Sequence, residues 1–156
     1  MTIDSFRGTY FFLSNFYPVD ITWDTLVFPT VEHAYQAAKT LNFDERLAIL
    51  AVSPKESKKM GREVTLRPNW DSCRLPIMEY LLRQKFSYPY LRDSLLITKD
   101  RELIEGNTCR EVFWGVYYKS EYNVIEGRMI DTREGENHLG KLLMKIRGEL
   151  RESTPA

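Results

Sequence analysis

Alternation of apolar and polar residues predicts strands in the first 28 positions of the chain. Residues 19–23 (Val-Asp-Ile-Thr-Trp) alternate, a turn is expected at Asp24 and Thr25, and residues 26–28 return, which is typical of a β-hairpin. The aromatic-rich residues 9–13 predict an earlier strand, followed by a loop over residues 14–18. Both segments are expected to contribute to a small sheet.

Helical spacing replaces alternation in the middle of the chain. Thr30 is the expected N-cap of a helix that ends near Leu41, with an apolar stripe at Val31, Ala34, Tyr35, Ala38 and Leu41. The segment Ser53-Pro54-Lys55-Glu56 is typical of a capping box with proline at the first helical position, so another helix begins there. Further helices are predicted over residues 44–52, with Asp44 as the cap, over residues 75–86 and over residues 88–96, with residues 69–73 as a connection.

Strand patterns return in the last third. Residues 102–105 and 112–118 are predicted strands, and residues 132–136 are a predicted polar turn. Asn137 is expected to cap a final helix, because leucine and isoleucine recur at helical spacing up to Leu150. The sequence therefore predicts an α+β fold. We expect a single domain over residues 1–150, in which about six helices wrap a small sheet built from the N- and C-terminal strands, and a flexible tail over residues 151–156.

Composition narrows the possible functions. The chain has 156 residues, of which 43% are apolar and 28% are charged, as is typical of a globular domain. Its 22 basic and 22 acidic residues cancel, which excludes a charge-driven nucleic-acid coat and a polybasic membrane anchor but not a small nucleotide site. No apolar run reaches the roughly 18 residues of a membrane span, and no signal peptide is recognisable. Cys73 and Cys109 lie far apart, so we expect neither a disulfide nor a zinc site, and a cytoplasmic location.

One face of the first predicted helix carries candidate chemistry. Glu32, Gln36 and Lys39 fall at positions i, i+4 and i+7 and therefore share that face. One interpretation is a solvated, charged helix face. The other is the rim of a cleft, where a carboxylate and a lysine supply acid–base chemistry and a nucleophilic amine. The spacing alone leaves both interpretations open.

Other motifs are less specific. No second histidine follows His33 on its helix, and His138 is the only other histidine, so we expect no bound metal. No Walker A, dinucleotide-binding or nucleophile-elbow pattern occurs, and we expect no cofactor. Trp114, before Gly115, is either a core residue or a surface on which a base stacks. Asn137 either caps its helix or contacts a ligand.

Several motifs nevertheless follow one another in a fixed order along nearly the whole chain. They are Phe6-Arg7-Gly8, residues 12–18 (FLSNFYP), residues 29–39 (PTVEHAYQAAK), Gly61-Arg62, Trp70, Lys85-Phe86, Phe113-Trp114-Gly115 and residues 137–144 (NHLGKLLM). In this combination the chain resembles the NADAR family, also called YbiA-like, which is named for its association with NAD and ADP-ribose metabolism. Two positions depart from the family pattern. Glu111 stands where the family usually has aspartate, three residues before the tryptophan, and Arg133 stands where the first glycine of the last loop is expected.

The resemblance implies an N-glycosidase. Such an enzyme hydrolyses the bond between ribose C1′ and a nitrogen, here in a phosphorylated ribosylamine or nucleotide-like substrate of the kind found in riboflavin synthesis. Glu32, or as second choice Glu111, would stabilise the positive charge that develops on the sugar. Lys39 could instead attack C1′ and form a Schiff base, and the choice between water and lysine stays open.

The resemblance also implies residues that contact the substrate. Arg7 or Lys85 would take the phosphate charge, together with backbone N–H groups after Asn137. Ser14, Asn15 and Asn137 would hold sugar hydroxyls, and Trp114 would stack on the departing base. The expected substrate-binding set is Arg7, Ser14, Asn15, Gln36, Trp70, Lys85, Trp114, Gly115 and Asn137.

Two other functions remain as alternatives. One is an ADP-ribosyl hydrolase that removes ADP-ribose from guanine in nucleic acid, and the other is a non-catalytic module that binds ADP-ribose or a nucleotide. The zero net charge favours a small phosphorylated, ribose-containing substrate over long nucleic acid. The presence of Glu32, Lys39 and Glu111 favours an enzyme, because a binding module does not need that set. The oligomeric state is left open.

Overall fold

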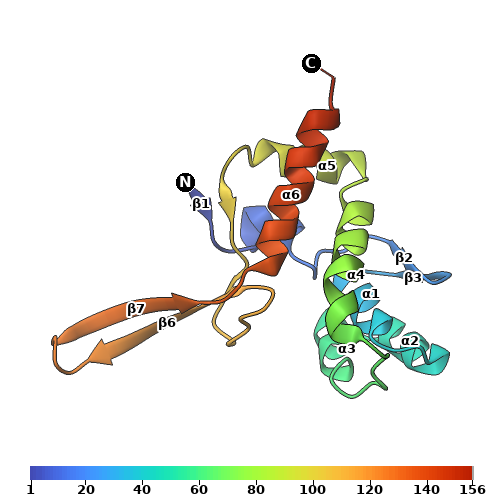
Figure 1. Cartoon of the computed structure of the whole chain (residues 1–156), viewed down its shortest axis with the longest axis horizontal. Helices are drawn as coiled ribbons and strands as arrows, with labels where there is room; N and C mark the ends of the chain where they lie inside the picture. The colour runs from blue at the N-terminus through green and yellow to red at the C-terminus, as the bar shows by residue number, and fades with distance from the viewer. Residues whose placement is uncertain (156) are drawn as a thin grey trace. The chain divides into compact units, whose positions relative to one another are not determined.

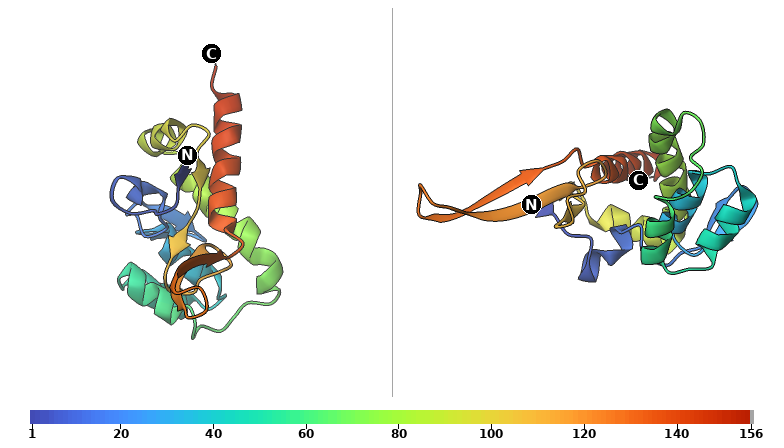
Figure 2. Two further views of the ribbon diagram at one scale, coloured as in Figure 1. Left: turned by 90° about the vertical axis from the view of Figure 1, so that its left-hand side faces the viewer. Right: turned by 90° about the horizontal axis from the view of Figure 1, so that it is seen from below.

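The computed structural model describes residues 1–155 and has the α+β fold that the sequence predicts. The chain forms two compact units. The internal unit is Asn15–Leu95, and the terminal unit combines Met1–Ser14 with the chain from Leu96 onward. Figure 1 labels helices α1 to α6 and several of the strands, and Figure 2 shows the chain from two further sides. Each unit contains part of the predicted site.

The internal unit begins with the predicted hairpin. Strands β2 (Ile21–Trp23) and β3 (Leu26–Phe28) pair antiparallel, with Ile21 opposite Phe28. Asp24 and Thr25 between them both have positive φ, of 43° and 70°. Two such residues match the right-handed twist of the flanking strands, which is why a two-residue turn closes this hairpin. The prediction of strand, turn and strand is confirmed.

Helix α1 (Val31–Ala38) occupies the core of the internal unit. All of its residues are buried, and it packs against α2 (Phe43–Leu50), α3 (Pro54–Met60), α4 (Trp70–Lys85) and the hairpin. The predicted N-cap is confirmed, because the Thr30 side chain accepts a hydrogen bond from the His33 N–H. The helix ends three residues earlier than predicted, since the Lys39 carbonyl accepts from the Arg67 N–H and Leu41 lies 63% exposed.

The other helices of the unit follow their sequence signals with local differences. The predicted capping box is present at α3, where the Ser53 side chain accepts from the Glu56 N–H. Asn42, and not Asp44, caps α2. Helix α4 begins at Trp70, so the predicted connection over residues 69–73 is wrong: the Asn69 carbonyl accepts from the N–H groups of residues 72 and 73 and starts the helix early. Helix α5 (Pro89–Ile97) closes the unit near its predicted place.

The terminal unit brings the two ends of the chain together. Strand β1 (Thr2–Ile3) pairs parallel with β4 (Glu102–Leu103), and β5 (Gly106–Asn107) pairs parallel with β6 (Val116–Asn123). The strand predicted over residues 9–13 is wrong. This segment is a 3₁₀ helix, η1 (Gly8–Leu13), because Gly8 adopts a positive φ of 56° and i→i+3 hydrogen bonds form at both ends.

Strand β6 continues into a long twisted ribbon with β7 (Arg128–Glu134), which leads into α6 (His138–Ser153) (Figure 1). The predicted strand over residues 112–118 begins only at Val116, and the predicted polar turn lies in β7 up to Glu134. Helix α6 continues to Ser153, which is three residues into the expected tail, and the end of that tail at position 156 lies outside the described residues. No helix in residues 1–155 is long and apolar enough to cross a membrane.

Candidate active site

The predicted face of α1 lies inside the internal unit and not in solvent. Glu32 is 7% exposed and Gln36 is 4% exposed, whereas Lys39, just after the helix, is half-buried. The Gln36 side-chain amide donates to Glu32 Oε1 at 2.7 Å. The Glu32 backbone N–H donates to the carbonyl of Asn15 at 3.0 Å, which fixes the first turn of the helix. The interpretation as a solvated face is therefore wrong.

Burial raises the pKa of the Glu32 carboxyl, because the charged form loses solvation. The hydrogen bond from Gln36 opposes this effect, and electrostatic interactions with Lys58, Lys39 and His33 oppose it more weakly. The protonated form of Glu32 is accordingly more populated than in an exposed glutamate. A carboxyl with a raised pKa gives up and takes up its proton at higher pH than an ordinary one.

The Lys39 ammonium shows the opposite effect. Burial is the largest effect and lowers the pKa of Lys39. The charge of Glu32 raises this pKa, and the positive charges of Arg62, Lys58 and Arg74 lower it further. The Nζ atom lies 3.5 Å from the carbonyl oxygen of Gly61 and 5.6 Å from the centre of the Tyr35 ring. The fraction of neutral amine is larger than in a solvated lysine, and only the neutral amine is a nucleophile.

Three basic residues around this pair were missed at the level of sequence. Lys58 lies on α3, Arg62 follows that helix, and Arg74 lies on α4. The signal that could have suggested two of them is the run Lys58-Lys59-Met60-Gly61-Arg62, which has three cations in five residues. Their convergence on α1 depends on how the helices pack, which the spacing along the chain does not contain.

Three further predicted residues belong to the internal unit. Trp70 is 7% exposed and packs against Tyr35, with ring centres 5.3 Å apart. Lys85 is fully buried, and its Nζ lies 5.5 Å from the centre of the Tyr17 ring. Asn15 donates from its amide to the sulfur of Met78 at 3.6 Å. Trp70 and Asn15 thus adjoin the α1 face through Tyr35 and the Glu32 backbone, whereas Lys85 packs against an aromatic ring.

Glu111, in the terminal unit, binds the loop that follows it. Its Oε1 accepts from the N–H groups of Phe113 and Trp114, both at 3.1 Å, and its Oε2 accepts from the Gly115 N–H at 2.6 Å. Asn107 fixes the Glu111 backbone from the other side, at both its N–H and its carbonyl. Both carboxylate oxygens therefore hold the loop in place.

The same loop caps α6. The carbonyls of Phe113 and Trp114 accept from the N–H groups of His138 and Leu139 at 3.1 and 3.0 Å. Those two N–H groups at the helix start are satisfied within the protein, so the expectation that they bind phosphate is wrong. The ring of Trp114 is half-buried and packs edge-on against Phe113, with centres 4.8 Å apart.

Asn137 and Gly115 serve the backbone of the terminal unit. The Asn137 side chain accepts from the Glu105 N–H at 3.0 Å and donates to the Leu103 carbonyl at 2.9 Å, and it makes no cap to its own helix. A Cβ at Gly115 would lie 2.3 Å from the carbonyl oxygen of Glu105. Close backbone packing therefore explains why this position has no side chain.

Arg7 and Ser14 flank η1 in the terminal unit. Arg7 is exposed and occupies the N-cap position, and Ser14 occupies the C-cap position, where its N–H donates to Phe11. The structure therefore brings together Asn15, Glu32, Gln36 and Lys39 in one unit, and Glu111, Trp114, Gly115 and Asn137 in the other.

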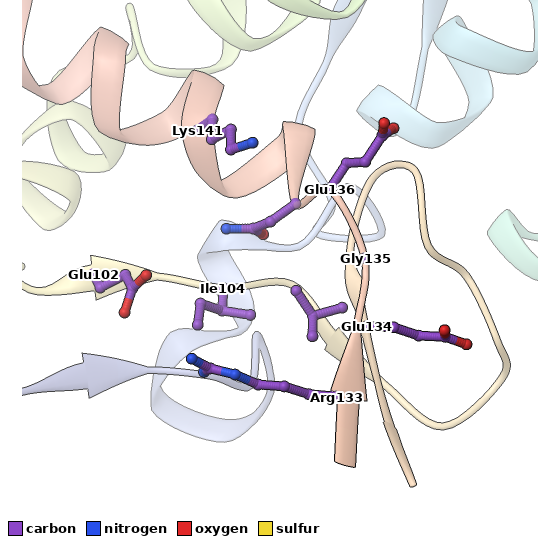
Figure 3. Close-up of a pocket in the computed structure, with 9 residues that line it drawn as sticks. Glu102, Ile104, Arg133, Glu134, Gly135, Glu136 and Lys141 are labelled. Atoms are coloured by element: carbon purple, nitrogen blue, oxygen red, sulfur yellow. The ribbon is translucent and has the colours of Figure 1, made fainter.

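A cavity of about 310 Å³ lies beside the start of α6 in the terminal unit (Figure 3). Arg133 extends across it on the same side as Glu102, while the side chains of Glu134 and Glu136 point away from the guanidinium. The lining residues are Glu102, Ile104, Val116, Arg133, Glu134, Gly135, Glu136, Asn137 and Lys141. Three carboxylates and two cations share this lining, so charge alone selects no class of ligand.

Comparison with known proteins gives consistent matches. The sequence pattern of the NADAR domain matches residues 5–151. The riboflavin biosynthesis protein PYRR, chloroplastic, of Zea mays is 34% identical over 164 aligned residues, which cover 92% of this chain. This chain spans only 24% of the length of that maize protein. The N-glycosidase YbiA of Escherichia coli is 36% identical over 156 aligned residues, which cover 96% of this chain and 89% of YbiA. The NMR structure of E. coli YbiA superimposes with a TM-score of 0.75 at 33% identity and covers 99% of this chain and 90% of that one.

Proposed function

This chain belongs to the NADAR domain family, and on that premise we propose that it is an N-glycosidase. Its reaction is hydrolysis of the bond between ribose C1′ and a nitrogen. Its substrate is a phosphorylated ribosylaminopyrimidine of the type found in riboflavin synthesis. The names of the relatives support both parts, since YbiA is named an N-glycosidase and the maize protein a riboflavin biosynthesis protein.

The observation that carries this proposal is the pair of buried Glu32 on α1 and half-buried Lys39 just after that helix. Burial moves the pKa of Glu32 upward and that of Lys39 downward, so the two values approach each other. A carboxyl and an amine whose pKa values are brought together can divide acid, base and nucleophile roles at neutral pH. A helix with only a structural role would not need an ionisable pair in its buried face, where each charge costs solvation.

The chemistry follows from the charge that develops on the sugar. When the C1′–N bond breaks, its electron pair leaves with the nitrogen, which takes up a proton, and positive charge spreads over C1′ and O4′. The carboxylate of Glu32 stabilises that charge, and water then adds to C1′. In the lysine route, neutral Lys39 bonds to C1′ as the C1′–N bond breaks and its electron pair leaves with the nitrogen, which takes up a proton. The lysine nitrogen then loses a proton and forms the C1′=N bond of the Schiff base, while the C1′–O4′ bond breaks and O4′ takes up a proton. Water later hydrolyses the Schiff base, which releases the sugar and regenerates the Lys39 amine.

The predicted substrate contacts of Arg7 and Trp114 stay predictions, whereas the Asn137 side chain and Gly115 are committed to the backbone of the terminal unit. Glu111 is better suited to positioning the Trp114 loop than to chemistry, because both of its oxygens accept backbone N–H groups. Cys73 and Cys109 are free thiols, which agrees with a reducing, cytoplasmic location.

The decisive experiment uses two separate substrates. The protein is incubated with a ribosylaminouracil phosphate and, in parallel, with DNA carrying ADP-ribosylated guanine, and released ribose phosphate or ADP-ribose is quantified. We expect release from the small substrate, and we expect Glu32→Gln to abolish it, a loss of at least about 100-fold, while the fold is retained. Glu152→Gln, an exposed glutamate near the end of α6, is the matched control with wild-type rates.

Borohydride during turnover separates the two routes. The lysine route predicts a covalent sugar adduct in the wild-type protein. This adduct should be absent in Lys39→Arg and present in the exposed control Lys55→Arg. Release of ADP-ribose from DNA, with no release from the small substrate, would instead support the ADP-ribosyl hydrolase. Binding without release from either substrate would favour the non-catalytic module.

A further inference from the structure

Gly61 contacts all three residues of the α1 face, directly or through one neighbour. Its carbonyl oxygen lies 3.5 Å from Lys39 Nζ. Its Cα faces the side chain of Gln36: a Cβ at this position would lie 1.8 Å from Gln36 Oε1 and 2.6 Å from Gln36 Cδ. The amide of Gln36 in turn donates to Glu32.

The backbone does not explain why this residue is glycine. Gly61 is the C-cap of α3, with φ −61° and ψ −17°, a conformation that any residue adopts. The nearest obstacles to a Cβ are three atoms of one side chain, Gln36. Only the contact with Gln36 therefore requires the absence of a side chain.

We propose that Gly61 is a positioning residue of the candidate active site: its missing side chain leaves the space occupied by the Gln36 amide, and this contact holds the amide on Glu32. The inference rests on the proposed function, in which Glu32 acts on the substrate. Gly61 itself touches no reacting atom and acts through Gln36.

The remaining contacts of the Gln36 amide support this role. Its Nε2 is committed to Glu32, while its buried Oε1 has no hydrogen-bond partner within residues 1–155. The orientation of the amide is thus fixed on one side by a hydrogen bond and on the other by packing against Gly61. Because a glutamine side chain is flexible, a methyl group at position 61 would move the amide rather than the helices.

The direction of the resulting change follows from the groups that face the pair. Those facing Glu32 are Gln36, Lys39 and His33 from its own segment and Lys58 from α3, and the hydrogen bond from Gln36 lowers its pKa the most. Arg62, after α3, and Arg74, on α4, face Lys39. Displacing the amide removes the strongest influence that lowers the pKa of Glu32, so this carboxyl titrates at higher pH.

The test compares Gly61→Ala with Gly148→Ala, at which a Cβ meets nothing within 4 Å. The pH profile of kcat/KM is measured for both, and the titration of the Glu32 carboxyl is followed by carbon-13 NMR. For Gly61→Ala we expect an intact fold, the acidic limb of the profile and the NMR midpoint at higher pH, and kcat/KM at neutral pH lower by about 10- to 100-fold. Gly148→Ala should keep the wild-type profile and midpoint.

A double-mutant cycle with Gln36→Ala shows whether Gly61 acts through Gln36. If it does, Gly61→Ala changes neither the Glu32 midpoint nor kcat/KM further once the Gln36 side chain is removed. Additive effects, or a Glu32 midpoint that Gly61→Ala leaves in place, would overturn the inference. A wild-type protein without glycosidase activity would instead overturn the proposed function, and the NMR titration, which needs no turnover, would still decide the role of Gly61.

Discussion

At the scale of single residues, one chemical effect acts on Glu32 and Lys39 in opposite directions. Removal from water disfavours the charged form of each group, so the carboxyl retains its proton to higher pH and the ammonium loses its proton at lower pH. Mutual attraction opposes burial at both groups, and the repulsion from Lys58, Arg62 and Arg74 adds to burial at Lys39. The packing of α1 offsets the free-energy cost of burying these two groups.

The raised pKa of Glu32 predicts how stability changes with pH. Below the ordinary pKa of a glutamate, the carboxyl is protonated in both the folded and the unfolded chain. As pH rises through the raised folded-state pKa, ionisation favours the unfolded chain, and the wild-type protein loses stability. Glu32→Gln, which stays neutral, should therefore gain Tm relative to wild type as pH rises above about 4.5, the ordinary pKa of a glutamate.

Thermal unfolding of the two proteins below and above this pH is the measurement. The exposed Glu152→Gln serves as the control and should follow the wild type throughout. A Tm difference between Glu32→Gln and wild type that stays constant with pH would contradict a raised pKa for Glu32.

At the scale of elements, the loop before β6 and the start of α6 form one hydrogen-bonded structure. The Glu111 carboxylate accepts N–H groups from residues 113–115, and the carbonyls of Phe113 and Trp114 accept from His138 and Leu139. Each peptide of the loop is thus bound on both sides, and this satisfies N–H groups at the start of α6 without a capping side chain. This hydrogen-bonded arrangement is enough to explain the motif around Trp114, without a contact to a substrate.

Glu111→Ala should consequently loosen both elements. Loss of a carboxylate that serves three backbone N–H groups is expected to lower the free energy of unfolding by about 1–3 kcal/mol. Urea denaturation gives this value, and amide hydrogen exchange should speed up at Gly115 and Leu139. Glu111→Asp, which retains a carboxylate, should lose less, and Glu152→Ala should lose little. Unchanged exchange at Gly115 in Glu111→Ala would contradict the arrangement.

At the scale of the whole molecule, the balance of charge restricts the partner. The 22 basic and 22 acidic residues cancel. Affinity for nucleic acid that depends on phosphate neutralisation needs a surplus of cations and falls steeply with salt. The net charge of the molecule therefore does not attract a long polyanion. A small phosphorylated substrate needs only one or two local cations.

Salt dependence provides the corresponding test. We expect no measurable binding to random duplex DNA at about 0.15 M salt, and a kcat/KM for the small substrate that falls by less than about tenfold between 0.05 and 0.2 M salt. Fluorescence anisotropy with labelled DNA and steady-state kinetics measure the two quantities. Tight DNA binding with a steep salt slope would instead favour the nucleic-acid substrate.

The sequence by itself determined the local features of this protein. The hairpin turn at Asp24 and Thr25, the cap at Thr30 and the capping box at Ser53 depend on backbone preferences and on hydrogen bonds between near neighbours, which a pattern of residues contains. For the same reason, helical spacing was enough to place Glu32, Gln36 and Lys39 on one face. The sequence pattern gave the wrong prediction at residues 9–13. Their aromatic content favours a strand, but the positive φ of Gly8 starts a 3₁₀ helix.

Only the tertiary structure decided whether that face meets water. Burial of Glu32, the approach of Lys58 to Glu32 and of Arg74 to Lys39, and the contact between Gly61 and Gln36 join segments up to 35 positions apart. Solvation and charge act through distance in space, and the packing of α3 and α4 on α1 sets that distance. The same holds for Asn137, whose side chain is committed to Leu103 and Glu105 by a contact that no local pattern records.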